Sequence, residues 1–108
     1  MKKGELWIIE IPGIDGHEQS GRRPALLFAD TKTHIAIVIP CTSNLHALRF
    51  PYTLQITPSK NNGLATPSVA LLLQIRAIDK KRLQKKIGTL EKKSLDQIDN
   101  LLRKLFHL

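Results

Sequence analysis

Two polar segments of this chain carry side chains that suit phosphate chemistry. The segment from Gly16 to Pro24, GHEQSGRRP, supplies a carboxylate, an amide and two guanidinium groups just before an apolar stretch. The run from Ala36 to Asn44, AIVIPCTSN, is apolar until it ends in two hydroxyls. Guanidinium and hydroxyl groups are good hydrogen-bond donors to phosphate oxygens. These residue types predict cleavage of RNA without a metal ion.

Metal-free cleavage of RNA requires the 2′-hydroxyl to attack its own phosphorus, so the protein only positions groups and neutralises charge. Negative charge grows on the non-bridging oxygens in the transition state, and a guanidinium fork stabilises it. We predict this role for Arg23, with Thr42 donating to the same phosphate and Ser43 as a weaker candidate. Arginine hardly ever deprotonates. The base is therefore Glu18, His17 or water, and these alternatives stay open.

Each of these residues also has an ordinary structural alternative. Arg23 could form a surface ion pair, and Thr42 could satisfy backbone groups where a strand ends. Glu18 and Gln19 could brace their own loop through backbone hydrogen bonds instead of contacting RNA. His17 is expected beside bound RNA rather than as the proton acceptor. We predict Arg23, Thr42 and Glu18 as catalytic, and His17 and Gln19 as RNA-binding.

Two polar residues, Gln74 and Arg76, interrupt a strongly apolar stretch. Such positions indicate a groove that meets RNA or an interface between subunits, and we assign them to the groove. Phe50 and Tyr52 flank Pro51 in an expected loop, where they could stack on bases. Packing is the alternative for this pair, and it is the one we favour. Other aromatic residues are expected in the core or at a dimer contact: Trp7, Phe28 and Phe106.

The single cysteine, Cys41, excludes an intrachain disulfide and a cysteine-based zinc cage. It lies in an expected buried strand, so we predict a core residue rather than a nucleophile. Three histidines, His34, His46 and His107, lack the spacing of metal ligands, and we assign them no function. We expect no metal or cofactor.

The chain has 108 residues, of which 42% are hydrophobic, so it can enclose one modest core. We predict a single domain, residues 1–108. The apolar runs are far shorter than the roughly 20 residues that span a bilayer, and no secretory leader follows Met1. We therefore expect a soluble, cytoplasmic protein.

The formal net charge is +8, and residues 80–108 hold nine basic and three acidic side chains. A basic balance of this size attracts polyanions, most obviously nucleic acid, without choosing a sequence. A solvated helix face and an acidic protein partner are the alternatives.

Apolar stretches bounded by turn residues predict a scaffold of short strands. The expected strands are Glu5–Ile11, Arg23–Ala29, Ile35–Pro40, Tyr52–Thr57 and Ser68–Ile78. The polar turn Asp30–Thr33 predicts an antiparallel hairpin between the second and third strands. This many short strands imply a closed or nearly closed sheet.

The end of the chain has the pattern of a helix instead. Apolar residues from Leu95 to Leu108 fall on one stripe, which predicts an amphipathic helix that caps the sheet. A shorter helical turn is expected at Lys80–Gln84, with Asp79 as its N-cap and Gly88 ending the pattern.

Four segments in order resemble the MazF/PemK-type toxin endoribonucleases: GELW from Gly4, GHEQSGRRP, the PCTSN end of the third strand, and SVALLLQIRAIDKKRL from Ser68. The resemblance spans nearly the whole chain. It implies a small SH3-like barrel, a homodimer, metal-independent cleavage of single-stranded RNA, and inhibition by an acidic antitoxin that covers the RNA groove. It also implies that Arg23 and Thr42 carry catalysis. One departure is Leu73, where the family usually has an acidic residue.

A second function is compatible with the same barrel. Toxins of the CcdB type poison a DNA topoisomerase without cutting nucleic acid, and fold alone does not separate the two. The arginine of GxRP and the threonine of PCT favour the nuclease, because a non-cleaving protein has no chemical need for them.

Overall fold

The computed structural model describes residues 1–11 and 21–108. Three predicted site residues, His17, Glu18 and Gln19, lie outside the described residues. Within the described part, seven strands form a sheet of order β4-β5-β3-β2-β1-β7, and β6 pairs with β3 beside this path. The strands are β1 (Glu5–Ile11), β2 (Gly21–Asp30), β3 (Ile35–Thr42), β4 (Thr53–Ile56), β5 (Ser68–Leu71), β6 (Arg76–Asp79) and β7 (Leu83–Thr89).

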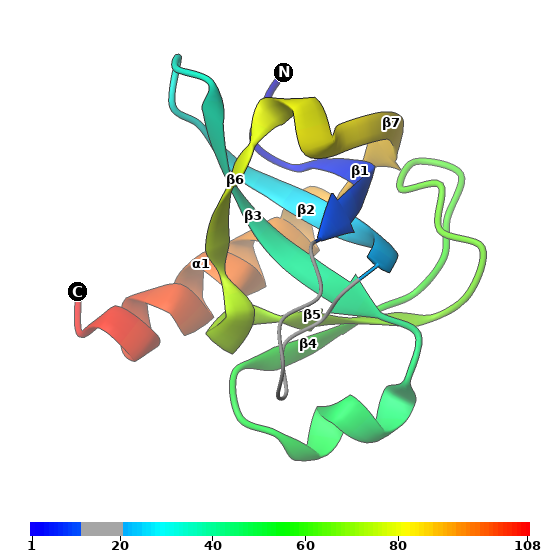
Figure 1. Ribbon diagram of the computed structural model, residues 1–108. Coiled ribbons are helices and arrows are strands. Elements are labelled where there is room, and N and C mark those ends of the chain that lie inside the picture. The colour runs from blue at the N-terminus through cyan, green and yellow to red at the C-terminus, as the bar shows by residue number, and fades with distance from the viewer. Residues whose placement is uncertain (12–20) are drawn as a thin grey trace.

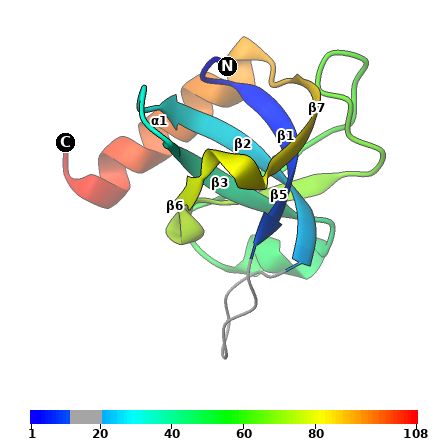
Figure 2. The same ribbon diagram turned by 45° about the horizontal axis from the view of Figure 1, so that its top comes forward.

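The sheet curls strongly but has two ends, β4 and β7, so the expected closed barrel is only loosely correct. The helix α1 (Lys92–Phe106) packs across one side of the curled sheet (Figures 1 and 2). The β2–β3 hairpin is antiparallel as predicted, with Ala25 opposite Pro40 and Leu27 opposite Val38. Its turn is held by the Asp30 carboxylate, which accepts from the Lys32 backbone N–H at 2.9 Å.

The two faces of the sheet carry two apolar clusters. Successive strand residues face opposite sides, so Leu26 enters the cluster that contains Ile98 and Leu102 of α1. Leu27 enters the other cluster, with Val38 and Ile78. Burying one Leu or Ile side chain stabilises the fold by about 1.5–3 kcal/mol. Two buried faces explain why β2 and β3 are continuous apolar runs.

The expected long strand Ser68–Ile78 is wrong, because the 3₁₀ helix η2 (Leu72–Gln74) divides it into β5 and β6. Both pieces pair with the same side of β3, through Thr42 for β5 and through Val38 for β6. The break faces Pro40, which has no N–H to donate to a continuous ladder. Leu73 lies on η2 and is 54% exposed. The apolar sequence of this segment predicted a buried position instead.

The predicted helical turn exists as the 3₁₀ helix η3 (Lys80–Arg82), and Asp79 caps it as expected by accepting from the Lys81 N–H at 3.0 Å. The strand β7, which follows η3 at once and pairs with β1, was not predicted. Its residues LQKKIGT are too polar to suggest a strand. Lysines are common on edge strands, where they discourage pairing with another chain.

The terminal helix was predicted correctly, and its Ile98 is fully buried. Phe106 is 52% exposed, so the expectation that it joins the core is not met within this chain. Trp7 and Phe28 are partly buried against the two clusters, as expected. Among the described residues, no helix is long and apolar enough to cross a membrane.

Candidate active site

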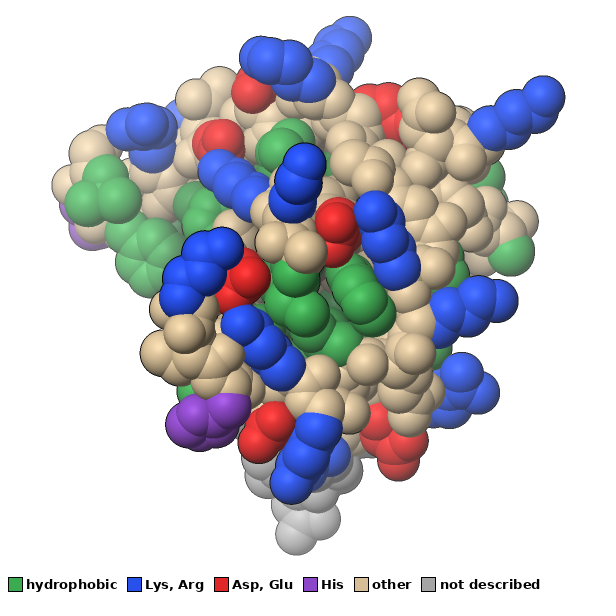
Figure 3. Space-filling model, turned by 90° about the horizontal axis from the view of Figure 1, so that it is seen from above, with side chains coloured by type: hydrophobic (Ala, Val, Ile, Leu, Met, Phe, Trp, Pro, Cys, Tyr) green, Lys and Arg blue, Asp and Glu red, His purple; other side chains and the backbone are tan. Residues whose placement is uncertain are grey.

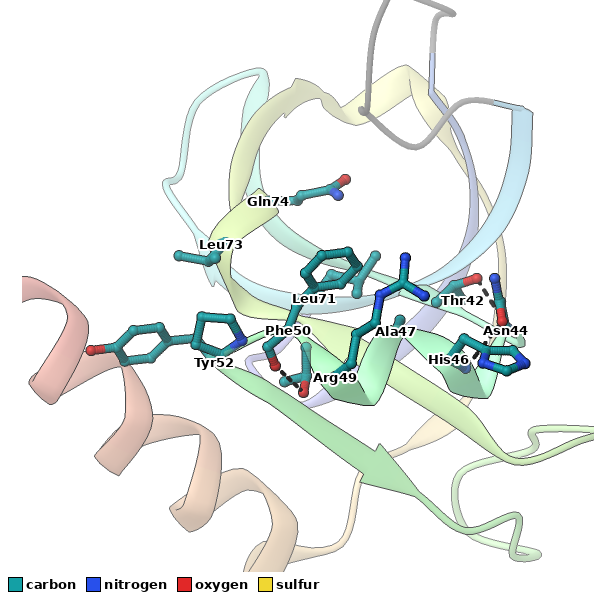
Figure 4. Close-up of a pocket in the computed structure, with 12 residues that line it drawn as sticks. Thr42, Asn44, His46, Ala47, Arg49, Phe50, Tyr52, Leu71, Leu73 and Gln74 are labelled. Atoms are coloured by element: carbon teal, nitrogen blue, oxygen red, sulfur yellow. Dashed lines mark hydrogen bonds between the residues drawn. The ribbon is translucent and has the colours of Figure 1, made fainter.

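A cavity of about 620 Å³ lies at the end of β3, beside the predicted site. We call it the Thr42 cavity. Its walls come from the end of β3, from the 3₁₀ helix η1 (Leu45–Arg49) with the residues after it, and from η2 (Figure 4). Its lining includes Thr42, Asn44, Arg49, Phe50, Leu73 and Gln74.

The end of β3 is fixed by local hydrogen bonds. Thr42 is only 6% exposed, and its Oγ1 accepts from the Asn44 backbone N–H at 3.2 Å. The Asn44 side chain in turn accepts from the His46 N–H at 3.1 Å and caps η1. The alternative role for Thr42, satisfying backbone at a strand end, is therefore real. A hydroxyl that accepts one bond can still donate its own proton to a ligand.

An exposed aromatic residue and a cation form the opposite wall. The Arg49 guanidinium lies 4.8 Å from the centre of the Phe50 ring, which is 51% exposed. Figure 4 shows both side chains rising into the cavity, whereas Tyr52 turns toward α1 and joins the main cluster. Phe50 thus has the exposure that stacking on a base requires, and Tyr52 packs. Arg49 was not predicted as a site residue; its adjacency to Phe50 in the sequence was the available signal.

Arg23 lies on β2 opposite Ile9 of β1. The last residue pair between β2 and β3 is Ala25 with Pro40. Arg23 lies two residues before Ala25 on β2, and Thr42 lies two residues after Pro40 on β3. Because alternate residues of a strand share a face, each of the two lies on the same sheet face as that last pair.

Arg76 belongs to this face as well. It pairs with Val38 on β3, and Val38 pairs on its other side with Leu27 of β2. Gln74 lies two residues before Arg76 on η2 and lines the Thr42 cavity. Three of the predicted site residues, each on a different strand, therefore belong to one side of the sheet: Arg23, Thr42 and Arg76.

A second cavity, of about 320 Å³, lies at the same end of the β2–β3 hairpin. We call it the Ser43 cavity. Arg23 borders this second cavity together with Ser43, whereas Thr42 borders the first. The predicted catalytic pair therefore lines two neighbouring cavities rather than one. Among the described residues, no acidic side chain lines either cavity, and both are bordered by arginine and hydroxyl groups.

The cysteine beside this site is unsuited to act as a nucleophile. Cys41 is fully buried, and burial raises the pKa of its thiol to about 12, so the thiolate nucleophile is absent near neutral pH. This agrees with the predicted core role. In the part of the chain that the structure describes, no group of three His, Cys, Asp or Glu residues could hold a metal ion. His46, which was given no function, lines the Thr42 cavity.

Comparison with known proteins gives a family. Residues 2–106 match the sequence model of the PemK-like, MazF-like toxin of type II toxin-antitoxin systems. The chain is 33% identical over 107 residues to "Endoribonuclease EndoA" of Bacillus subtilis (strain 168), covering 95% of this chain and 91% of that protein.

Solved structures agree in fold. The structure of MazF from Deinococcus radiodurans superposes with a TM-score of 0.82 at 24% identity, covering all of this chain and 97% of that one. The structure titled MazE-MazF from the same organism gives a TM-score of 0.74 at 24% identity, covering 100% and 96% of the two chains. With the family match over residues 2–106, these findings establish that the chain belongs to the PemK-like, MazF-like toxin family.

Proposed function

We propose that this protein is an endoribonuclease toxin that cleaves single-stranded RNA without a metal ion. The observation that carries the proposal is the 33% identity, over 95% of the chain, to a protein named as an endoribonuclease. The cavities agree with that activity, because their arginines and hydroxyls suit a polyanionic ligand. The topoisomerase-binding alternative has no support in these comparisons.

In the proposed reaction the 2′-hydroxyl of RNA attacks the adjacent phosphorus, and the bond to the 5′-oxygen breaks. The products are a 2′,3′-cyclic phosphate and a 5′-hydroxyl. Arg23 stabilises the charge that develops on the non-bridging oxygens, and Thr42 donates a hydrogen bond to the same phosphate. Both residues belong to one sheet face, which supports a shared role.

Proton transfer completes the reaction: a base takes the proton of the 2′-hydroxyl, and the departing 5′-oxygen gains a proton from that base or from water. Glu18, His17 and water remain the candidates, because an arginine hardly ever deprotonates. Gln74 and Ser43 border the cavities and are proposed to bind RNA, together with Arg76, His17 and Gln19.

The proposal includes partners. With a net charge of +8, the chain attracts RNA and equally an acidic protein. Figure 3 shows lysine and arginine side chains projecting around the face that carries β7 and η3. We include in the proposal an acidic antitoxin that blocks the RNA site, a homodimer, action in the cytoplasm where mRNA lies, and a single domain over residues 1–108.

The test incubates the purified protein with a long natural transcript in excess chelator and analyses the fragment ends. The expected fragments carry a 2′,3′-cyclic phosphate on one side and a 5′-hydroxyl on the other. Intact RNA would refute the nuclease, and inhibition of a topoisomerase by the same preparation would then favour the binding alternative. Mapping the cut sites also gives the sequence that the protein prefers.

A further inference from the structure

The Ser43 cavity has the composition of a small binding site for an amphipathic ligand. Its apolar lining comes from three strands: Ile8 of β1, Pro24 of β2 and Ile87 of β7. Its polar side chains are those of Arg22, Arg23, Ser43, Thr66 and Ser68. Its volume of about 320 Å³ falls at the lower end of the 300–1,000 Å³ that is common for small-molecule sites. A nucleobase has this same combination of apolar faces and polar edges.

One wall of the Ser43 cavity, residues 63–66 of the β4–β5 loop, is held in place by buried hydrogen bonds. Asn62 is fully buried, and its side-chain oxygen accepts from the backbone N–H groups of Ser59 and Leu64, both at 3.0 Å. Its side-chain nitrogen donates to the Glu91 carboxylate at 3.1 Å. A wall fixed by such a network is formed before a ligand arrives, which lowers the cost of binding.

The Ser43 cavity lies next to the predicted reaction centre. Thr42 lines one cavity and Ser43, the next residue, lines the other. Arg23, which is proposed to contact the scissile phosphate, itself lines the Ser43 cavity. An RNA strand whose scissile phosphate contacts Arg23 can therefore place a neighbouring base in the Ser43 cavity.

Cations at the edge of the Ser43 cavity suit the phosphate attached to that neighbouring base. Arg22 donates through Nε to Gln84 at 2.8 Å, and its guanidinium has further N–H donors. Lys85 of β7 pairs with Ile8, which puts a second cation beside the cavity lining. Glu10 is the acidic group in this network and accepts from the Gln84 amide at 3.0 Å.

We propose that the Ser43 cavity is a second nucleotide subsite, which takes the base next to the scissile linkage while Arg22 contacts the phosphate attached to that base. The proposal rests on the proposed nuclease function. It assigns part of the sequence preference to the β4–β5 loop, because this loop supplies the wall that the base would touch.

The test uses a short RNA centred on a mapped cleavage site, with a 2′-deoxy sugar at the scissile nucleotide so that it binds without being cut. Ala65→Phe would fill the cavity, since Ala65 is an exposed residue of its lining. Ala77→Phe is the matched control, because Ala77 is also exposed but lies on β6, outside both linings. Fluorescence anisotropy gives the affinities, and thermal denaturation checks folding.

We expect Ala65→Phe to weaken binding about tenfold, which corresponds to about 1.4 kcal/mol. Removing the base at one position next to the scissile nucleotide should weaken wild-type binding similarly, and Ala65→Phe should add little to that loss. Equal affinities of wild type and Ala65→Phe, or effects that multiply, would overturn the subsite. Cleavage of the natural transcript by wild type in chelator keeps that outcome separate from a failure of the proposed function.

A second variant keeps the subsite testable if Ala65→Phe unfolds. Arg22→Gln should lower the slope of log affinity against log salt concentration by about one, because one phosphate contact is lost. Lys81→Gln, on η3 and outside the cavity, is the control for general charge. An unchanged slope for Arg22→Gln, or an equal change for both variants, would contradict the proposal.

Discussion

The side-chain nitrogen of Asn62 donates to a carboxylate oxygen of Glu91 at 3.1 Å, which joins the β4–β5 loop to the residue that precedes α1. The Ser59 hydroxyl donates to the other carboxylate oxygen at 2.6 Å and, with Asn62, lowers the pKa of Glu91. The Asn62–Glu91 hydrogen bond joins residues that are 29 positions apart in the sequence. The two bonds to Glu91 therefore attach the wall of the Ser43 cavity to the start of α1.

Replacing Asn62 by alanine should be strongly destabilising. The change leaves the backbone N–H groups of Ser59 and Leu64 without their acceptor, and an unsatisfied buried group such as the Leu64 N–H costs about 1–3 kcal/mol. We expect the free energy of unfolding in urea to fall by about 2–4 kcal/mol. Asn61→Ala, at an exposed position whose backbone oxygen makes the contact to Thr89, should change it by less than about 0.5 kcal/mol. Equal losses for the two variants would contradict this account.

Gly63 has two separate reasons to be glycine. Its φ is +70°, and an added Cβ would lie 2.0 Å from the Ile87 carbonyl oxygen on β7. Gly21 has a similar φ of +81°, but an added Cβ meets nothing within 4 Å among the described residues. Gly21→Ala should therefore cost only about 1–2 kcal/mol for the strained backbone, and Gly63→Ala considerably more. Thermal denaturation of both variants measures the difference, which should vanish only if the close approach to β7 is absent in solution.

Local patterns predicted much of the fold. β1, the β2–β3 hairpin and α1 each have a clear apolar period and a turn or cap within a few residues, so neighbouring residues determine them. β7 has neither, because its lysines lie on an edge strand that depends on pairing with the distant β1. The break at η2 was equally hidden, since no glycine or proline within Ser68–Ile78 marks it, and the residue that lies opposite the break, Pro40, is on a different strand.

The site was predicted only in part, for the same physical reason. Thr42, Ser43 and Gln74 line cavities, and their contact with RNA stays a prediction. The walls formed by Arg49 with Phe50 and by residues 63–66 were not foreseen. The segment PSKNNG has the composition of any turn, and its position depends on a carboxylate at Glu91 that no local pattern connects to it.

Stability should depend on pH through Asp30. A hydrogen bond from Lys80, followed by one from the Lys32 backbone, lowers the pKa of this carboxyl from 3.8 to about 2. A lowered folded-state pKa contributes stability above the unfolded-state value, and that stability is lost as pH falls from about 4 toward about 2. We expect the urea midpoint of wild type to fall across this window, and the fall to be smaller in Asp30→Asn. Asp96→Asn removes the exposed ion pair between Asp96 and Lys92, and its urea midpoint should depend on pH as that of wild type does.

Arg23→Lys should separate charge from geometry. An ammonium keeps the positive charge but loses the planar fork that fits two phosphate oxygens. We expect the cleavage rate under single-turnover conditions to fall by about 100-fold or more, while affinity for uncleavable RNA stays within about threefold. Arg103→Lys, exposed on α1 and outside both cavity linings, is the matched control for the rate. A lysine variant of Arg23 that cleaves like wild type would remove the transition-state role.

Thr42 tests whether the hydroxyl donates to the substrate or only supports the turn. Thr42→Val keeps the shape of a nearly buried side chain but removes both the donor and the acceptor for the Asn44 N–H. We expect a stability loss of about 1 kcal/mol and a rate loss of about 100-fold. Thr42→Ser restores the hydroxyl and should recover most of the rate. Asn44→Ala disturbs the same turn by removing the cap of η1, so a rate loss as large as that of Thr42→Val would mean that Thr42 acts only through the backbone.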